Sequence, residues 1–292
     1  MKTRVKGFAK INLHLDVTGI RDDGYHNIQS VMQTVSLCDI VDIEITEGGN
    51  IVIECDRAGV PLDEKNIAYK AAKIFFEKAD IRSGVKITIK KNIPMAAGLA
   101  GGSADGAAVL VGLNELFESV LSEDDIYALG ATLGADVPFC ISCGCCYTEG
   151  IGEKLTDIDP LSPETVLVIA CGGEGVSTPM AYGMLDTRYG RFVDYTPCGC
   201  DELKKSLKLG ENDFYKHIFN IFEEPVASVR EAVGIAKKIM LDSGARASMM
   251  SGSGPSVFGV FANTDDADRA VARLLADGYF ATVAYPTVKR QF

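Results

Sequence analysis

A glycine-rich segment at residues 94–105 restricts the possible folds of this chain more than any other feature. It reads Pro-Met-Ala-Ala-Gly-Leu-Ala-Gly-Gly-Ser-Ala-Asp, between an alternating apolar run at residues 85–89 and an alanine-rich stretch at residues 103–117. These flanks predict a strand and a helix. Glycines let a ligand approach the backbone closely, and free N–H groups at a helix start attract anions. The segment therefore predicts a polyphosphate-binding loop, with an ordinary flexible loop as the alternative.

Alternation of apolar and polar side chains near the N-terminus predicts a strand with one buried face. The apolar members are Ile11, Leu13, Leu15 and Val17. Lys10 and Asn12 fall between them, so we expect these two polar side chains to share the open face of the strand.

Periodicity along the rest of the chain predicts an α+β protein with two domains, residues 1–160 and 161–292. Further strands are expected at residues 41–45, 51–53, 85–89, 137–148, 165–171, 256–262 and 279–286. Helices are expected from residue 66, at 103–117 and 123–133, from residue 177, and around 226–240 and 267–275. Gly48 and Gly49 favour a hairpin turn between the strands at 41–45 and 51–53, and Gly134 favours a left-handed end for the helix before it.

The overall charge and hydropathy argue against several classes of partner. A net charge of −11 disfavours nucleic acid. No apolar run approaches the ~20 residues that cross a bilayer, and no secretory signal is visible. We therefore expect a cytoplasmic protein that binds neither nucleic acid nor membrane, and no obligate protein partner is indicated.

The nine cysteines favour free thiols over a disulfide framework. Four of them cluster at Cys140, Cys143, Cys145 and Cys146. A zinc or iron–sulfur site is conceivable, but the spacing fits no paired zinc pattern and cysteine also serves as a small buried hydrophobe. We therefore expect no protein-bound metal.

The glycine-rich segment is neither a P-loop nor a dinucleotide fingerprint, and it resembles the phosphate-binding signature of the GHMP kinases. Residues 9–15, with Asp23-Gly24-Tyr25-His26, resemble the N-terminal signature of one branch, the diphosphocytidyl-methylerythritol kinases. Residues 251–258, Ser-Gly-Ser-Gly-Pro-Ser-Val-Phe, resemble the third motif of the family. The resemblance implies a ribosomal-S5-domain-2-like N-terminal domain and a ferredoxin-like C-terminal domain.

The resemblance also implies roles for individual residues. Asp136 in Leu-Gly-Ala-Asp-Val-Pro matches the catalytic aspartate, and Lys10 would offset charge on the transferring phosphoryl group. ATP is expected on Pro94, Met95, Ala96, Ala97, Gly98, Leu99, Ala100, Gly101, Gly102, Ser103 and Ala104, with Mg²⁺ carried by the nucleotide. The substrate is expected on Asn12, Tyr25, His26, Tyr182, Gly252, Ser253 and Gly254. Ala104 replaces a serine of the usual signature, but the backbone donors remain.

The implied activity is ATP-dependent phosphorylation of the 2-hydroxyl of a diphosphocytidyl-methylerythritol in non-mevalonate isoprenoid precursor biosynthesis. The expected partner is therefore a small molecule that carries cytidine diphosphate. Two alternatives are a GHMP kinase acting on homoserine, a sugar or mevalonate, and a non-catalytic member that keeps the fold. Tyr25 and His26 argue against the first, because those substrates have no base to stack. The joint presence of Lys10, Asp136 and the loop argues against the second.

Overall fold

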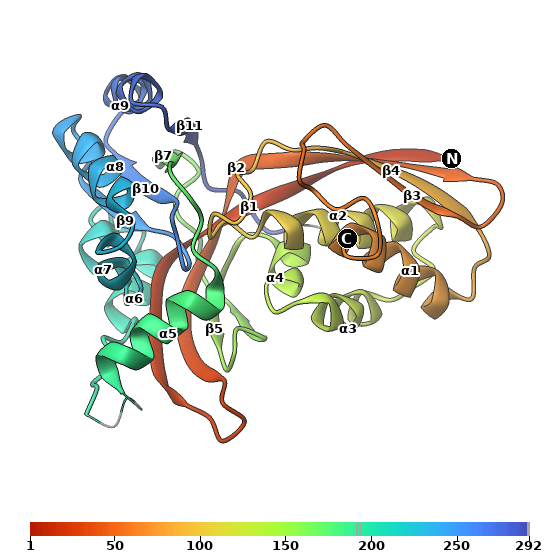
Figure 1. Cartoon of the computed structure of the whole chain (residues 1–292), viewed down its shortest axis with the longest axis horizontal. Helices are drawn as coiled ribbons and strands as arrows, with labels where there is room; N and C mark the ends of the chain where they lie inside the picture. Colours follow the sequence, from red (N-terminus) through yellow and green to blue (C-terminus); the bar gives the residue numbers. More distant parts are fainter. Residues whose placement is uncertain (191, 193, 291–292) are drawn as a thin grey trace.

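Two sheets organise the chain in the computed structural model, which describes residues 1–190, 192 and 194–290 (Figure 1). The first half contains β1 (Lys2–Ile20), β2 (His26–Thr46), β3 (Ile51–Cys55), α1 (Ile67–Ala79), β4 (Gly84–Lys90), α2 (Gly101–Leu116), α3 (Glu123–Leu133), α4 (Val137–Ser142), β5 (Cys145–Glu149) and β6 (Lys154–Asp157). The second contains β7 (Val166–Cys171), α5 (Thr178–Tyr189), α6 (Asp201–Leu209), a 3-10 turn (Phe214–His217), β8 (Phe219–Asn220), α7 (Glu223–Ala227), α8 (Glu231–Asp242), β9 (Ala247–Met250), β10 (Val257–Phe261), α9 (Thr264–Ala276) and β11 (Phe280–Ala284).

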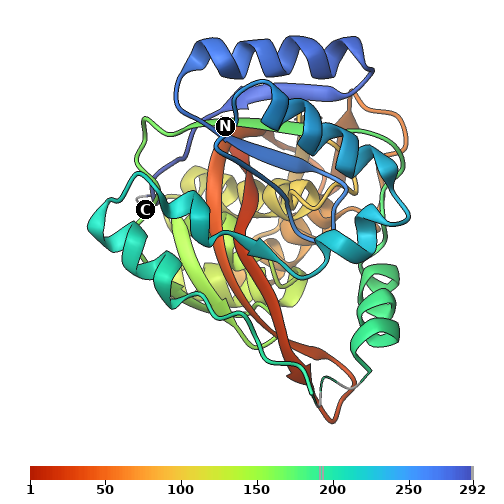
Figure 2. The ribbon, with the colours of Figure 1, turned by 90° about the vertical axis from the view of Figure 1, so that its left-hand side faces the viewer.

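The first sheet is built on the long antiparallel pair β1 and β2, which runs past the second sheet to a tip beside α5 (Figure 2). Its strand order is β3-β4-β2-β1-β8, and β5 and β6 extend it from β2. The predicted hairpin between β2 and β3 is wrong, because β4 inserts between them and pairs antiparallel with β2 and parallel with β3. The Gly48-Gly49 turn therefore only redirects the chain.

Helices α1 to α4 cover one face of this sheet (Figure 1). Small residues let α2 approach β1 closely: a Cβ added at Gly7 would lie 2.8 Å from the carbonyl oxygen of Ala104. Ala104, Ala107 and Ala108 on the alanine-rich face of α2 are buried. This close packing fixes the start of α2, and with it the glycine-rich loop, against β1.

The second sheet has the strand order β11-β7-β10-β9, antiparallel throughout. With α8 and α9 packed on the sheet, the chain order is the βαββαβ pattern of a ferredoxin-like fold. Along β7, Val166, Val168 and Ala170 face the core around these helices, and Leu167 and Ile169 join the core of the first sheet. Burial on both faces explains why β7 is a continuous apolar run. The expected α+β, two-domain fold is confirmed, and the boundary at residue 160 stays a prediction.

Several local predictions are wrong. Residues 137–148 form α4 and then β5 rather than one strand, because Pro138 lies in the first turn of a helix, where its missing N–H costs nothing. Gly134 is extended at φ 164° instead of left-handed. The helix expected around 226–240 is divided into α7 and α8.

The predicted open face of β1 is also wrong. Lys10 and Asn12 are 6% and 3% exposed, and His14 further along is fully buried against the ring of Phe219. The second half of the chain covers this face, so its polar side chains face a cavity or a buried network. Within the described residues, no helix combines the length and apolar composition that a bilayer crossing requires.

Candidate active site

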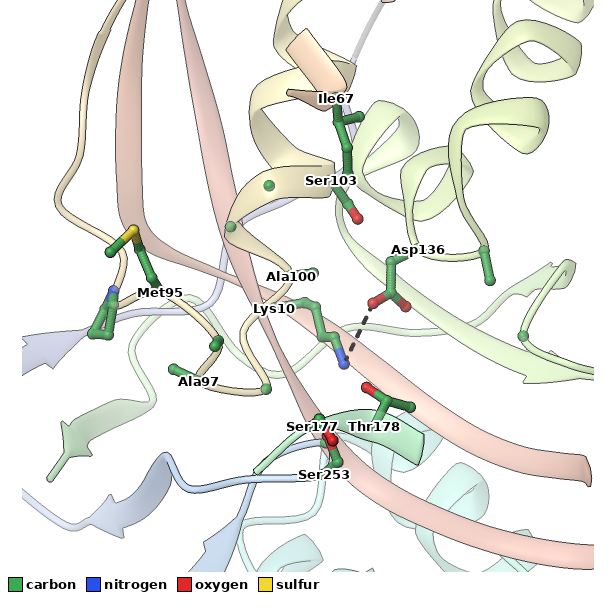
Figure 3. A pocket seen from close by; sticks show the side chains of 18 of the residues that line it. Lys10, Ile67, Met95, Ala97, Ala100, Ser103, Asp136, Ser177, Thr178 and Ser253 are labelled. Atoms are coloured by element: carbon green, nitrogen blue, oxygen red, sulfur yellow. Dashed lines mark ion pairs between the residues drawn. The ribbon is translucent and has the colours of Figure 1, made fainter. Parts of the chain in front are cut away.

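A cavity of about 730 Å³ lies where the two halves meet. Ile67 of α1, Gly101 of α2 and Thr178 of α5 all line it, so three helices begin at its wall (Figure 3). The N-terminus of a helix carries a partial positive charge and unpaired N–H groups. The cavity is therefore suited to a highly charged anion, even though the protein as a whole is acidic.

The glycine-rich loop forms one side of the cavity. Ala96, Gly98 and Ala100 have positive φ values of 50°, 75° and 57°, which turn successive peptide groups of the loop. The first hydrogen bond of α2 runs from the N–H of Ala104 to the carbonyl of Ala100. In the described chain, the N–H groups of residues 101–103 donate to no other group, so they are available for phosphate oxygens. The loop thus fits the polyphosphate of ATP.

Ser251 joins the three sequence motifs. Its hydroxyl accepts a hydrogen bond from the N–H of Asn12 at 3.3 Å and donates one to the carbonyl of Gly98 at 3.1 Å. The N–H of Ser256, from the same motif, donates to the carbonyl of Ala97 at 3.2 Å. The segment at 251–258 therefore holds the loop against β1.

Lys10 and Asp136 meet in the middle of the cavity (Figure 3). Lys10 Nζ lies 4.0 Å from Asp136 Oδ2, and the two side chains are 7% and 39% exposed. Lys10 Nζ also donates to Asn12 Oδ1 at 2.7 Å, and Asn12 Nδ2 donates to Ser30 at 2.8 Å. The lysine is therefore held in place, while the carboxylate, at the start of α4, remains open to a ligand. This pair can accept a proton from an alcohol and offset negative charge beside it.

An aromatic cluster lies where the β1–β2 tip meets α5. The ring of His26 packs 4.5 Å from that of Tyr182, centroid to centroid, and its Nε2 lies 2.7 Å from Asp186 Oδ1. Burial of Tyr182 raises the pKa of its phenol to about 12, so this hydroxyl stays neutral. Tyr25 is 61% exposed on the connection between β1 and β2.

The structure brings most of the predicted site residues to one cavity. Its lining includes Lys10, Asn12, Asp136, Tyr182, Gly252, Ser253, residues 94–98 and residues 100–103. Leu99 and Ala104 are buried in the core beneath the loop, and Gly254 supports its own turn by donating its N–H to the carbonyl of Ser251. Tyr25 and His26 are not part of the cavity lining. His26 does contact Tyr182, which lines the cavity.

Sequence reasoning missed several lining residues. Asn66 and Ile67 line the cavity at the start of α1, and Ser177 and Thr178 at the start of α5. Both helix starts were predicted from the sequence, but not their place in the cavity wall. Asn66 caps α1, because its Oδ1 accepts a hydrogen bond from the N–H of Ala68 at 2.9 Å. Asp186 gave no local signal, because only the fold brings it to His26.

The cysteine cluster does not form a metal centre in the described part of the chain, where no three His, Cys, Asp or Glu side chains gather as metal ligands would. All four thiols are buried, and burial raises the pKa of Cys146 to about 12. Neutral buried thiols pack as small hydrophobes.

Comparison with known proteins defines the class. Residues 66–144 match the model for the N-terminal domain of GHMP kinases, and residues 201–279 match the model for the C-terminal part of GHMP kinases. The chain belongs to the GHMP kinase family. A crystal structure of homoserine kinase from Cytophaga hutchinsonii has the same fold, with a TM-score of 0.73 and 19% identity over 99% of this chain and 96% of that one.

Within this family, the chain is similar in sequence to several proteins that share one name. The 4-diphosphocytidyl-2-C-methyl-D-erythritol kinase of Clostridioides difficile (strain 630) is 45% identical over 90% of this chain and 88% of its own length. The kinase of the same name from Caldicellulosiruptor saccharolyticus is 43% identical, with 92% of each chain covered. A crystal structure of 4-(cytidine 5'-diphospho)-2C-methyl-D-erythritol kinase matches with a TM-score of 0.79 and 32% identity, over 97% of this chain and 99% of that one.

Proposed function

We propose that this chain transfers the γ-phosphate of ATP to the 2-hydroxyl of 4-diphosphocytidyl-2-C-methyl-D-erythritol, a step of isoprenoid precursor biosynthesis. The observation that carries the proposal is the convergence of Lys10, Asp136 and the N-terminus of α2 in one cavity. The names of relatives more than 40% identical over nine tenths of the chain support the choice of substrate.

The residues of the cavity divide the work. ATP, with Mg²⁺ on its phosphates, would supply the phosphoryl group. The N–H groups of residues 101–103 bind phosphate oxygens and orient the nucleotide. Asp136 accepts the proton of the substrate hydroxyl, and the Lys10 ammonium offsets charge on the transferring group. Because Lys10 is held by Asn12, it needs little reorganisation during the reaction.

The substrate test compares alcohols with and without cytidine diphosphate. ATP-dependent phosphorylation should show a kcat/KM at least ~10²-fold higher for the diphosphocytidyl alcohol than for methylerythritol phosphate, homoserine or mevalonate, because loss of the base contacts leaves polar protein groups unpaired. ADP release coupled to product analysis measures it. Equal kcat/KM values, or a preference for a cytidine-free alcohol, would contradict the proposal.

Asp186→Asn should weaken substrate binding. Asp186 engages Nε2 of His26, which leaves Nδ1 as the ring nitrogen that could bond the base. A hydrogen bond to a charged group contributes about 1.5–3 kcal/mol, so KM for the diphosphocytidyl alcohol should rise about 10-fold while kcat changes less. Arg188→Gln is the control, since Arg188 lies on the same helix but pairs with the exposed Glu224. Unchanged KM in Asp186→Asn would remove Asp186 from the base site.

The domain boundary, the cytoplasmic location, magnesium carried by the nucleotide and the lack of a nucleic-acid or obligate protein partner stay predictions from the sequence. Tyr25 also stays a predicted base-stacking residue, one that would have to move toward the cavity when substrate binds.

A further inference from the structure

A buried charge cluster lies behind the glycine-rich loop. The side chains of Lys91, Asp39 and Asp105 are 4%, 0% and 5% exposed. The Lys91 ammonium contacts the carboxylate of Asp39 and lies 2.7 Å from Asp105 Oδ2. The three residues come from different elements, namely β2, the connection after β4, and α2. Burying three ionisable groups to this degree carries a large desolvation cost, which their mutual contacts must offset.

The cluster holds both ends of the loop. Asp39 Oδ1 accepts hydrogen bonds from the N–H groups of Asn92 at 2.6 Å and Ile93 at 2.8 Å, the two residues before the loop. Asp105 lies in α2, one turn after the N–H groups available for phosphate. A Cβ added at Gly101 would lie 3.4 Å from Lys91 Nζ, so the ammonium packs directly beneath the helix start. Lys91 therefore connects the start of the loop, held by Asp39, with the end of the loop, where Asp105 lies in α2.

The charges of the cluster do not balance when both carboxylates are ionised, because two negative groups then face one ammonium. Asp105 Oδ1 is buried with no hydrogen-bond partner in the described chain. Burial, countered by Lys91 and reinforced by Asp39, raises the pKa of Asp105 to about 7. The titratable groups that face it are Lys91, Asp39 and, from β3, the thiol of Cys55. A proton on Asp105 would make the cluster neutral.

We propose that Lys91, Asp39 and Asp105 position the glycine-rich loop. We further propose that Asp105 takes up a proton from solvent when a nucleoside triphosphate binds to this loop. The polyphosphate brings negative charge to the wall that Asp105 and Lys91 line, which favours the neutral form of the carboxyl. By linkage, the affinity for the nucleotide falls as the pH rises above about 7. The inference rests on the proposed nucleotide site and is independent of the acceptor alcohol.

Calorimetry of ATP binding, without acceptor, tests the proton uptake. Titrations at pH 6 to 9 in buffers of different ionisation enthalpy give the number of protons bound with each nucleotide. Near pH 7 to 8, the unchanged chain should take up a fraction of a proton more than Asp105→Asn, whose carboxamide stays neutral. Above that range, the affinity of the unchanged chain for ATP should fall by an amount that approaches tenfold per pH unit. Asp105→Asn controls for the ionisation of ATP itself. Equal uptake by the two proteins overturns the proposal, as does an unchanged chain that takes up no proton.

Removal of the cation tests the positioning role. Lys91→Met should raise KM for ATP at least ~10-fold with a smaller effect on kcat, because the loop loses its anchor, and Lys91→Arg should restore part of the affinity. Lys90→Met is the matched control, since Lys90 is the exposed neighbour at the end of β4. Circular dichroism and the Tm identify a variant that does not fold. In that case the proton uptake of the unchanged chain, measured by calorimetry, decides whether the proposal stands. Tight ATP binding by folded Lys91→Met overturns the positioning role.

Discussion

Asp136→Asn should lower kcat by about 10²–10⁴ while leaving KM for both substrates close to its original value. The carboxamide has nearly the same shape but cannot accept the proton of the substrate hydroxyl. Asp136 makes no side-chain hydrogen bond at the start of α4, and Lys10 keeps its bond to Asn12, so the fold should be unaffected. Steady-state kinetics and the Tm measure the two effects separately.

The control for this variant is Asp125→Asn, because Asp125 is similarly exposed and pairs with Lys78 on the surface of the helices. Its kcat should not change. Lys10→Met should also reduce kcat, and the double variant Lys10→Met with Asp136→Asn should lose less than the product of the two single losses, as residues that act on one step do. A kcat for Asp136→Asn within twofold of the unchanged chain would exclude Asp136 as the base.

Gly98→Ala should disable nucleotide binding and destabilise the protein. A Cβ at this position would lie far inside van der Waals contact with the carbonyl oxygen of Ser251, and only 3.1 Å from the N–H of Gly254. These are backbone atoms of the segment that holds the loop, so neither can move without loss of the Ser251 contacts to Asn12 and Gly98. Overpacking costs about 1–3 kcal/mol, and a left-handed conformation with a side chain costs about 1–2 kcal/mol more. The Tm should fall and KM for ATP should rise at least ~10-fold.

Gly49→Ala separates the clash from the backbone strain. Gly49 has a φ of 74°, against 75° for Gly98, and a Cβ there would meet nothing within 4 Å. The Gly49→Ala variant should therefore lose only the stability that backbone strain at this position costs, and it should keep its affinity for ATP. If Gly98→Ala behaved like Gly49→Ala in both measurements, close packing between the loop and the 251–258 segment would not matter for the site.

The sequence determined most of the local elements and the chemistry of the loop, with helix α4 as an exception. Helices α1 and α3 begin within one residue of their predicted starts, where Asn66 and Ser122 cap them, and residues 94–100 form a loop that leads into α2. These features depend on interactions between residues a few positions apart, namely caps, periodic apolar faces and glycine dihedrals. For that reason they can be read without knowledge of the partners in the fold.

Only the tertiary structure decided which strands pair and which side chains meet. Nothing near Gly48 indicates that β4 will insert between β2 and β3, and nothing near His26 indicates that Asp186 will bind it. The same holds for the burial of Lys10 beneath the second half of the chain and for its approach to Asp136. Such contacts depend on the packing of both sheets into one core and on the closure of long loops, and the free energy of those steps is not contained in any local pattern.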